Sequence, residues 1–329
     1  MTERDTPVGA LSEAEILARI VRRLGPSRAL VGPGDDAAVL AEPGAPLVAT
    51  TDTLVHGPDF RLAWSSGHDL GWKAAAVNLA DIAAMGARPI ALLVALAMPE
   101  DTRIGFVEDL ADGLRAACDA LAPGCAVEGG DLTVSDTLTI AVTALGAADP
   151  PAPVLRRTAR VGDVVALAGE AGHAARGLAL LFDRFRDADG IPLPVDEAVL
   201  DASERVVLRA QLRPSPPVDA GVHAARAGAT AMIDVSDGLA LDATRVADAS
   251  GVTIALDTSV LGDDLAAALT GGEDHALLAT FPADAALPHP FRAIGVVRER
   301  GEAPLLVDDR PFTGRGGWDP YRDWDSARG

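Results

Sequence analysis

Positive charge is scarce in this chain. Lys73 is the only lysine, and 28 basic residues stand against 48 acidic ones, so the formal net charge is -20. A protein that binds nucleic acid or an anionic membrane needs a basic surface to neutralise phosphates. The composition therefore argues against both as partners. Anionic ligands stay open, provided that metal ions mediate the contact.

Aromatic residues, cysteines and long apolar runs are also few. Aromatics make up 4% of a chain that is 49% hydrophobic, so the core must consist of Ala, Val and Leu. Two cysteines, Cys118 and Cys125, exclude a disulfide framework, and no C-x-x-C motif is present. The longest apolar run, PIALLVALAMP, is far shorter than the ~20 residues that span a bilayer, and no signal-like stretch is visible. We expect a soluble, cytoplasmic protein.

The length of 329 residues is enough for two domains of ordinary size. The segment GAADPPAPVLRR (146–157) is rich in Pro and Ala and has no periodicity, so it is the best candidate for a linker. Strand-like and helix-like segments alternate on both sides of it. We expect an α/β (α+β) fold with two mixed α/β domains, over residues 1–148 and 149–329.

Local signals predict several elements. Ser12 and Glu15 form a capping-box pattern at the start of a helix, and apolar spacing predicts a second helix over 68–87 that stops at Gly86. A third helix is predicted over 103–121, with Cys118 on its core face. Strands are predicted at 48–53 and 89–97, and 125–131 and 137–146 are expected to pair. Beyond the linker, strands are predicted in 162–169, 229–238 and 271–281, and helices in 172–182 and 238–251.

Carboxylates stand beside glycines or at the ends of predicted elements in six places. Each place alone fits an ordinary turn, because Asp and Gly are turn residues. Together they favour one site for a hard metal, since Asp, Thr and Ser oxygens suit Mg²⁺. The histidines lack the spacing that zinc sites show. The six places contain Asp35 and Asp36, Asp52, Asp81 (one helix face with Asn78), Asp131, Asp234 with Ser236 and Asp237, and Glu273 with Asp274.

Familiar phosphate-binding and nucleophile motifs are missing. A Walker A loop needs Gly-Lys-Ser/Thr, but the only lysine follows Trp72, and no protein-kinase motif is present. GPGDDA matches G-x-G-x-x-A, yet Asp35 and Asp36 would then face a pyrophosphate. Ser236 in DVSDG is not in a G-x-S-x-G elbow. These absences leave metal-mediated phosphate binding as the favoured chemistry.

The motifs, taken in order, resemble those of the thiamine-monophosphate kinase family. They are GDDAAVL, TTDTLV, KAAAVNLADIAAMGA, GGD, R-x-x-A-x-x-GD, MIDVSDGL and GGEDHAL, and the resemblance runs from about Glu13 to Trp318. Several are shared with the wider aminoimidazole-ribonucleotide synthetase-like superfamily. The resemblance implies two α/β domains and a homodimer whose N-terminal sheets meet in a barrel. It also implies direct, in-line, Mg²⁺-assisted phosphoryl transfer from ATP to thiamine monophosphate, with several Mg²⁺ ions.

The resemblance also implies roles for individual residues, carried over by motif. Implied metal ligands are Asp36, Thr50, Thr51, Asp52, Asp81, Asp131, Asp234 and Asp237. Implied ATP contacts are Gly130, Asp131, Arg156 and Ser236. Asp59, Glu273 and Trp318 are the implied thiamine-phosphate contacts, with Trp318 stacking on the cationic ring. Catalysis would depend most on Asp52, Asp131 and Arg156.

Two departures concern the acceptor pocket. The family pattern Gly-x-His-Phe is here Gly57-Pro58-Asp59-Phe60, and Pro320 replaces a second histidine. Neither change touches the metal cluster.

Another ATP-using enzyme of the superfamily remains an alternative, such as an aminoimidazole-ribonucleotide or selenophosphate synthetase. The selenophosphate branch would want a reactive cysteine near the N-terminus, but no cysteine precedes Cys118. A two-metal phosphohydrolase and a non-catalytic Mg²⁺- or nucleotide-binding protein also remain open.

Overall fold

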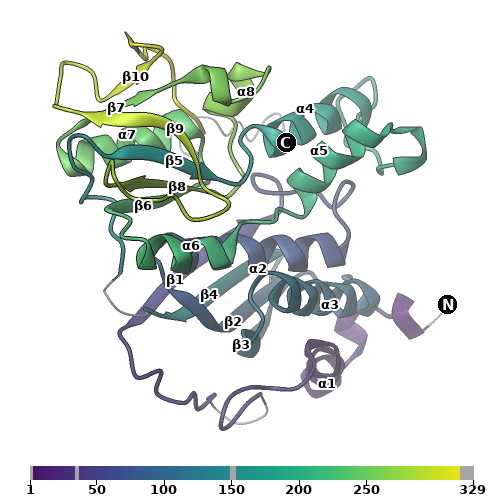
Figure 1. Ribbon diagram of the computed structural model, residues 1–329. Coiled ribbons are helices and arrows are strands. Elements are labelled where there is room, and N and C mark those ends of the chain that lie inside the picture. The colour runs from purple at the N-terminus through teal and green to yellow at the C-terminus, as the bar shows by residue number, and fades with distance from the viewer. Residues whose placement is uncertain (1–2, 34–36, 149–152, 319–329) are drawn as a thin grey trace.

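Two β-sheets with helices between and around them form the molecule (Figure 1). The computed structural model describes residues 3–33, 37–148 and 153–318. All strands of the four-stranded sheet lie before residue 148, and all strands of the seven-stranded sheet follow residue 163. The predicted mixed α/β class is confirmed.

The first half of the chain builds the four-stranded sheet, in the order β1-β4-β2-β3. In this sheet β2 and β3 run parallel, joined by a crossover through α3, and β4 is antiparallel to both β1 and β2. The sheet of one chain is open, with β1 and β3 at its edges. Its elements are α1 (Glu13–Leu24), β1 (Leu47–Val55), α2 (Gly67–Ala84), β2 (Arg88–Met98), α3 (Ile104–Leu121), β3 (Ala126–Val134) and β4 (Thr139–Ala147).

The helices predicted here are confirmed. The Ser12 side chain accepts a hydrogen bond from the Glu15 backbone while Glu15 bonds back to Ser12, which completes the capping box of α1. Helix α2 ends before Gly86, whose φ of 68° lies in the left-handed region that glycine adopts without strain. Local capping signals were sufficient for both boundaries.

The predicted pairing of residues 125–131 with 137–146 is wrong. These residues form β3 and β4, and β2 lies between them. The α3 crossover places β3 beside β2 at the sheet edge, whereas β4 fills the space between β1 and β2. The order matters for function, because it separates β3 from β1.

Helix α2 is the element on which the site depends, and it is buried almost along its whole length. It packs closely against α3, since a Cβ on Gly71 would lie 2.0 Å from the Leu110 carbonyl oxygen. Its other sides face the four-stranded sheet and the strands β6 and β8 of the second sheet. Polar side chains on α2 are therefore held between the two sheets.

The second half builds the seven-stranded sheet, in the order β11-β10-β7-β9-β5-β8-β6. Its strands are β5 (Val164–Ala168), β6 (Ala231–Val235), β7 (Thr253–Leu256), β8 (Ala276–Phe281), β9 (Arg292–Arg298), β10 (Leu305–Val307) and β11 (Arg310–Pro311). Its helices are α4 (His173–Arg184), α5 (Ala202–Leu212), α6 (Val218–Arg226), α7 (Leu239–Ser250) and α8 (Leu265–Thr270). The strands and helices predicted beyond the linker correspond to β5, α4, β6, α7 and β8.

One hydrophobic core joins the two halves. Leu79 and Ile82 of α2 belong to the same buried cluster as Met232 of β6 and Phe281 of β8. Figure 1 shows α2 and α6 lying between the two sheets, where this cluster is formed. The junction between the two sheets is therefore closely packed, which holds α2 in a fixed position against β6 and β8.

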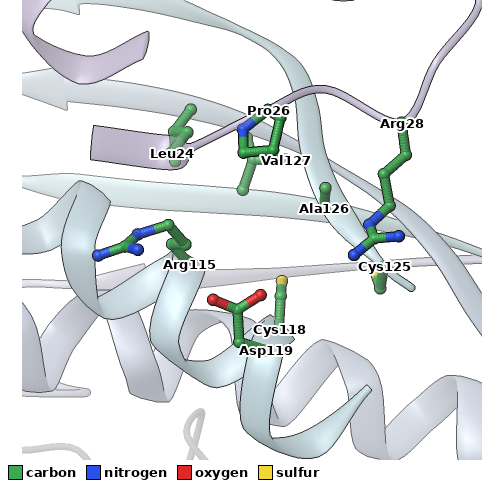
Figure 2. Close-up of a pocket in the computed structure, with 9 residues that line it drawn as sticks. All are labelled: Leu24, Pro26, Arg28, Arg115, Cys118, Asp119, Cys125, Ala126 and Val127. Atoms are coloured by element: carbon green, nitrogen blue, oxygen red, sulfur yellow. The ribbon is translucent and has the colours of Figure 1, made fainter. Parts of the chain in front are cut away.

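Both cysteines are free and buried, as expected for Cys118 on the core face of α3. A hydrogen bond to Cys125, together with burial, raises the pKa of the Cys118 thiol. The two line a cavity of about 90 Å³ with Arg28, Arg115 and Asp119 (Figure 2). A second cavity, of about 360 Å³, lies near the start of α4.

No helix in the described ranges combines the length and apolar character needed to cross a membrane.

Candidate active site

Strand β1 and helix α2 bring the first group of predicted residues together. The Thr50 hydroxyl donates to Asp81 Oδ2 at 2.7 Å, and the Asp52 backbone N–H donates to Asn78 Oδ1 at 3.2 Å. Thr50 and Asp52 are two residues apart in a strand, so their side chains share the face that α2 covers. Asn78 is buried, which fixes the register between β1 and α2.

The facing ends of β6 and β8 supply the second group. Asp234 is the fourth residue of β6, and its Oδ2 lies 3.3 Å from Nδ1 of the buried His275. Two backbone bonds join the segments, from Glu273 N–H to the Ser236 carbonyl at 2.7 Å and from His275 N–H to the Val235 carbonyl at 2.9 Å. The second sheet thus presents a carboxylate towards α2 in a fixed orientation.

The carboxylates of the two groups influence one another. Burial, and then the charge of Asp234, raises the pKa of Asp81 to about 7. Partial burial also raises the pKa of Asp52, which His275 lowers and Asp234 raises. Burial lowers the pKa of His275, but its bond to Asp234 and the charges of Asp234 and Glu273 together outweigh this effect, and the net shift is upward. Three acids from β1, α2 and β6 therefore repel one another at the junction of the sheets.

The described oxygens at this junction have the chemistry of a hard-metal site but not a complete ligand shell. Among the residues that the structure describes, no three His, Cys, Asp or Glu side chains converge closely enough to hold an ion by themselves. The donors are nevertheless hard oxygens, from the Thr50 hydroxyl and from the mutually repelling carboxylates of Asp52, Asp81 and Asp234. Mg²⁺ is bound in proteins by one or two carboxylates, with substrate phosphates and water completing the shell. The donor chemistry fits Mg²⁺ bound together with a phosphate ligand.

Asp237, another predicted metal ligand, has a partner within the protein. Arg245 Nη1 lies 2.6 Å from Asp237 Oδ2 and 2.7 Å from Oδ1 of the fully buried Asp242. Oδ2 of Asp242 also accepts the N–H groups of Asp237 and Gly238. Asp242 and Arg245 therefore fix the turn between β6 and α7.

The predicted acceptor contacts Asp59 and Glu273 lie near each other. Asp59 Oδ2 accepts the Val55 N–H at 2.7 Å, which closes the turn after β1. Burial, and then the charge of Glu273, raises the pKa of Asp59. Glu273 is paired with the buried Lys73 at 2.6 Å. Trp318, 41% exposed, is anchored by its backbone N–H to the Asp237 carbonyl at 2.9 Å.

Gly130 and Asp131 are not brought to this group within one chain. The register places Asp52, Val142, Val94 and Gly130 in one row across the sheet. Three strand intervals of ~4.8 Å separate the first from the last by about 14 Å. A Cβ on Gly130 would also lie 2.0 Å from the Val94 carbonyl oxygen, so packing alone requires glycine there.

Thr51 and Asp131 lie on the sheet face opposite to α2. The Thr51 hydroxyl donates to the Val142 carbonyl at 2.9 Å and accepts from Thr143 at 3.2 Å. Asp131 is exposed, and by alternation its side chain shares this outer face. Neither side chain therefore joins Asp52 and Asp81 in the single chain.

Arg156 is also distant from the junction. Its carbonyl accepts the Ser250 hydroxyl at 3.1 Å, at the last residue of α7, while Asp237 precedes the first. A helix of 12 residues is about 18 Å long. The predicted ligand Asp36, the neighbouring Asp35, and Pro320 lie outside the described residues.

Five residues at the site were missed in the sequence: Lys73, Gln211, Asp242, Arg245 and His275. Asp242 and Arg245 had a local signal, because an acid and a base three apart in a helix directly after DVSDG can pair with each other and with Asp237. His275 stands in GGEDHAL. Lys73 opens the motif KAAAVNLADIAAMGA, but nothing local indicates its contact or that of Gln211, since their partner Glu273 is remote in the chain.

Comparisons with known proteins show which proteins this chain is similar to. A family model described as AIR synthase related protein, N-terminal domain, matches residues 34–148. The chain is 39% identical to a thiamine-monophosphate kinase of Mycobacterium tuberculosis, over 96% of this chain and 93% of that protein. A thiamine-monophosphate kinase of Corynebacterium glutamicum is also 39% identical, over 96% of this chain and 95% of that protein.

Solved structures with a similar fold also include thiamine-monophosphate kinases. A thiamine-monophosphate kinase from Stenotrophomonas maltophilia superposes with a TM-score of 0.75 at 33% identity, covering 92% of this chain and 98% of that one. A structure of AaThiL complexed with AMPPCP and TMP gives a TM-score of 0.72 at 30% identity, covering 95% and 98%. The similarity in both comparisons extends over both sheets.

Proposed function

This chain belongs to the thiamine-monophosphate kinase family, and on that basis we propose that it transfers the γ-phosphate of ATP to thiamine monophosphate, forming thiamine diphosphate. The observation that carries the proposal is the Thr50–Asp81 hydrogen bond at the junction of the two sheets, where Asp52 and Asp234 lie near enough to raise the pKa of Asp81. A relative's complex with TMP and AMPPCP, an analogue of ATP, supports the same pair of substrates.

The acceptor itself needs little activation. A phosphate monoester is largely dianionic at pH 7, because its second pKa is about 6, so no strong base has to remove a proton. The obstacle is repulsion between two phosphate groups. When bound, Mg²⁺ supplies positive charge that offsets this repulsion and charge developing in an in-line transition state. Thr50, Asp52, Asp81 and Asp234 would hold it, and His275 orients Asp234.

The charges around the proposed acceptor contacts suit thiamine. Lys73 contributes one positive charge, while Glu273 and Asp59 contribute two negative charges, which leaves one net negative charge. The thiazolium ring of thiamine is a cation, so this balance is complementary to it. The exposed ring of Trp318 offers an aromatic face on which such a cation can stack.

A homodimer would explain the position of Gly130 and Asp131. Thr51, Thr53, Ala95 and Asp131 are exposed on the outer face of the four-stranded sheet, and their mostly short side chains let a second sheet approach closely. In a two-fold dimer the same patch of both chains meets. The β3 edge of one chain could then complete the site at the β1 edge of its partner, with Asp131 on the metal and Gly130 near ATP.

One assay tests the proposed function. The purified protein is mixed with ATP, Mg²⁺ and thiamine monophosphate, and thiamine diphosphate is measured by chromatography. We expect the diphosphate to form, and we expect free thiamine, the control acceptor, to give none. Release of inorganic phosphate from thiamine monophosphate without ATP would favour a phosphohydrolase instead.

A further inference from the structure

The only lysine of the chain is buried between the two sheets. Lys73 lies on α2 with 3% of its surface exposed, and its Nζ is 2.6 Å from Glu273 Oε1. The second carboxylate oxygen, Oε2, accepts a hydrogen bond from Gln211 Nε2 of α5. Donors from two helices thus hold both oxygens of one carboxylate. Lys73 opens the motif KAAAVNLADIAAMGA but has no role assigned from it, and Gln211 lies outside the motifs.

The orientation of Gln211 is fixed by chemistry. An ionised carboxylate can only accept hydrogen bonds, and its pairing with Lys73 lowers the pKa of Glu273 in spite of burial. The amide nitrogen of Gln211 must therefore face Glu273. This leaves Gln211 Oε1 buried without a hydrogen-bond donor in the described part of the chain. An apolar residue would avoid this cost, so packing alone does not explain a glutamine here.

The backbone of Glu273 supports the same conclusion. Its φ of 67° lies in the left-handed region, which is costly for a residue with a side chain. The Glu273 N–H donates to the Ser236 carbonyl at 2.7 Å, in the turn that also carries Asp237. The chain therefore maintains an unfavourable conformation that directs this carboxylate to Lys73 and Gln211. About a third of the Glu273 side chain remains exposed and able to meet a ligand.

We propose that Lys73 and Gln211 are positioning residues that orient the Glu273 carboxylate to accept a hydrogen bond from the amino group of the acceptor's aminopyrimidine ring. This inference rests on the proposed function, because it takes thiamine monophosphate as the acceptor. Each carboxylate oxygen has further acceptor capacity beyond its bond to Lys73 or Gln211. A carboxylate held rigidly in this way distinguishes an amino group from an oxygen at the same place on the ring.

The experiment measures binding by calorimetry, so that it does not depend on turnover. The probes are thiamine monophosphate and oxythiamine monophosphate, in which an oxygen replaces the amino group. We expect the wild type to bind the first at least about tenfold more tightly. Gln211→Met should reduce this ratio to near one and leave the affinity for AMPPCP unchanged. Lys73→Met should do the same, and Lys73→Arg should restore part of the preference.

A matched control comes from Arg213 and Asp69, an ion pair that also links the end of α5 to α2. Arg213, next to the end of α5, has its Nε 3.0 Å from Oδ1 of Asp69 in α2. Arg213→Met should keep the full preference for the amino group. A Gln211→Met protein with a native melting temperature and an unchanged ratio would overturn the proposal. If the wild type binds thiamine monophosphate but Gln211→Met leaves the ratio unchanged, the proposed function stands and only this inference is wrong. If the wild type does not bind thiamine monophosphate, both the proposed function and this inference are wrong.

Discussion

Asp52 and Gly130 lie in one row of the four-stranded sheet but at opposite edges, with β4 and β2 between them. Both lie in motifs whose family resemblance implies that they contribute to one catalytic centre. A single chain cannot bring them together, because the row is about 14 Å wide. A second chain can, if its β3 edge approaches the β1 edge of the first. This relationship makes the proposed dimer part of the account of catalysis.

Mixing two inactive variants tests the shared site. Asp52→Asn and Asp131→Asn should each abolish turnover alone, because each removes a charge from the metal-binding set. If the two residues of one site come from different chains, mixed dimers contain one intact site. Co-refolding equal amounts should then restore about a quarter of wild-type activity. If activity stays absent in mixtures that contain mixed dimers, both residues act from one chain and the shared site is wrong.

The raised pKa of Asp81 predicts a dependence of stability on pH. The unfolded carboxyl titrates near 3.8 and the folded one near 7, so the folded state keeps a proton that the unfolded state releases. Without Mg²⁺, the free energy of unfolding should fall as pH rises through this window, by a few kcal/mol at most. Bound Mg²⁺ should offset the loss above pH 7, where Asp81 is ionised.

Thermal unfolding between pH 5 and 8, with and without Mg²⁺, measures this effect. Asp81→Asn should flatten the decline and remove most of the gain from Mg²⁺. Asp69→Asn serves as the control, since Asp69 lies on the same helix and pairs with Arg213. An Asp81→Asn protein with the wild-type pH profile would show that Asp81 does not carry the charge that Mg²⁺ offsets.

Two tryptophans should separate stability from substrate binding. Trp64 is 5% exposed, donates from Nε1 to the Phe185 carbonyl at 3.0 Å, and packs with Leu181 and Leu208 of α4 and α5. Trp64→Ala should lower the free energy of unfolding by about 3–5 kcal/mol in urea titrations. Trp318→Ala should lower it by less than about 1 kcal/mol and raise the KM for thiamine monophosphate. The reverse pattern would remove the role assigned to Trp318.

Asp59 should contribute charge rather than shape. Asp59→Asn keeps an oxygen that can accept the Val55 N–H but removes the negative charge beside Lys73 and Glu273. We expect the KM for thiamine monophosphate to rise about fivefold, which corresponds to about 1 kcal/mol of attraction to a cationic ring. The KM for ATP should not change. Equal changes in both constants would point to a disturbed turn after β1 instead.

The sequence predicted what depends on local signals. The strand predicted at 48–53 corresponds to β1, and capping patterns gave the start of α1 and the end of α2. Strand order depends on pairing between remote segments, so β3 was placed beside β4 although β2 separates them. For the same reason the sequence could not show that Lys73 meets Glu273, 200 residues further along. The pairing of Arg245 with Asp237 was within reach, because Arg245 and Asp242 are three apart in the helix that follows Asp237.

Transfer of a labelled phosphate tests the central claim most directly. ATP labelled in its γ-phosphate is incubated with thiamine monophosphate, Mg²⁺ and the protein, and the label is followed in the thiamine diphosphate formed. The account predicts stoichiometric transfer to the new terminal phosphate by the wild type, without a labelled protein intermediate, and none by Asp52→Asn. Absence of labelled thiamine diphosphate with folded, substrate-saturated wild-type protein would contradict it.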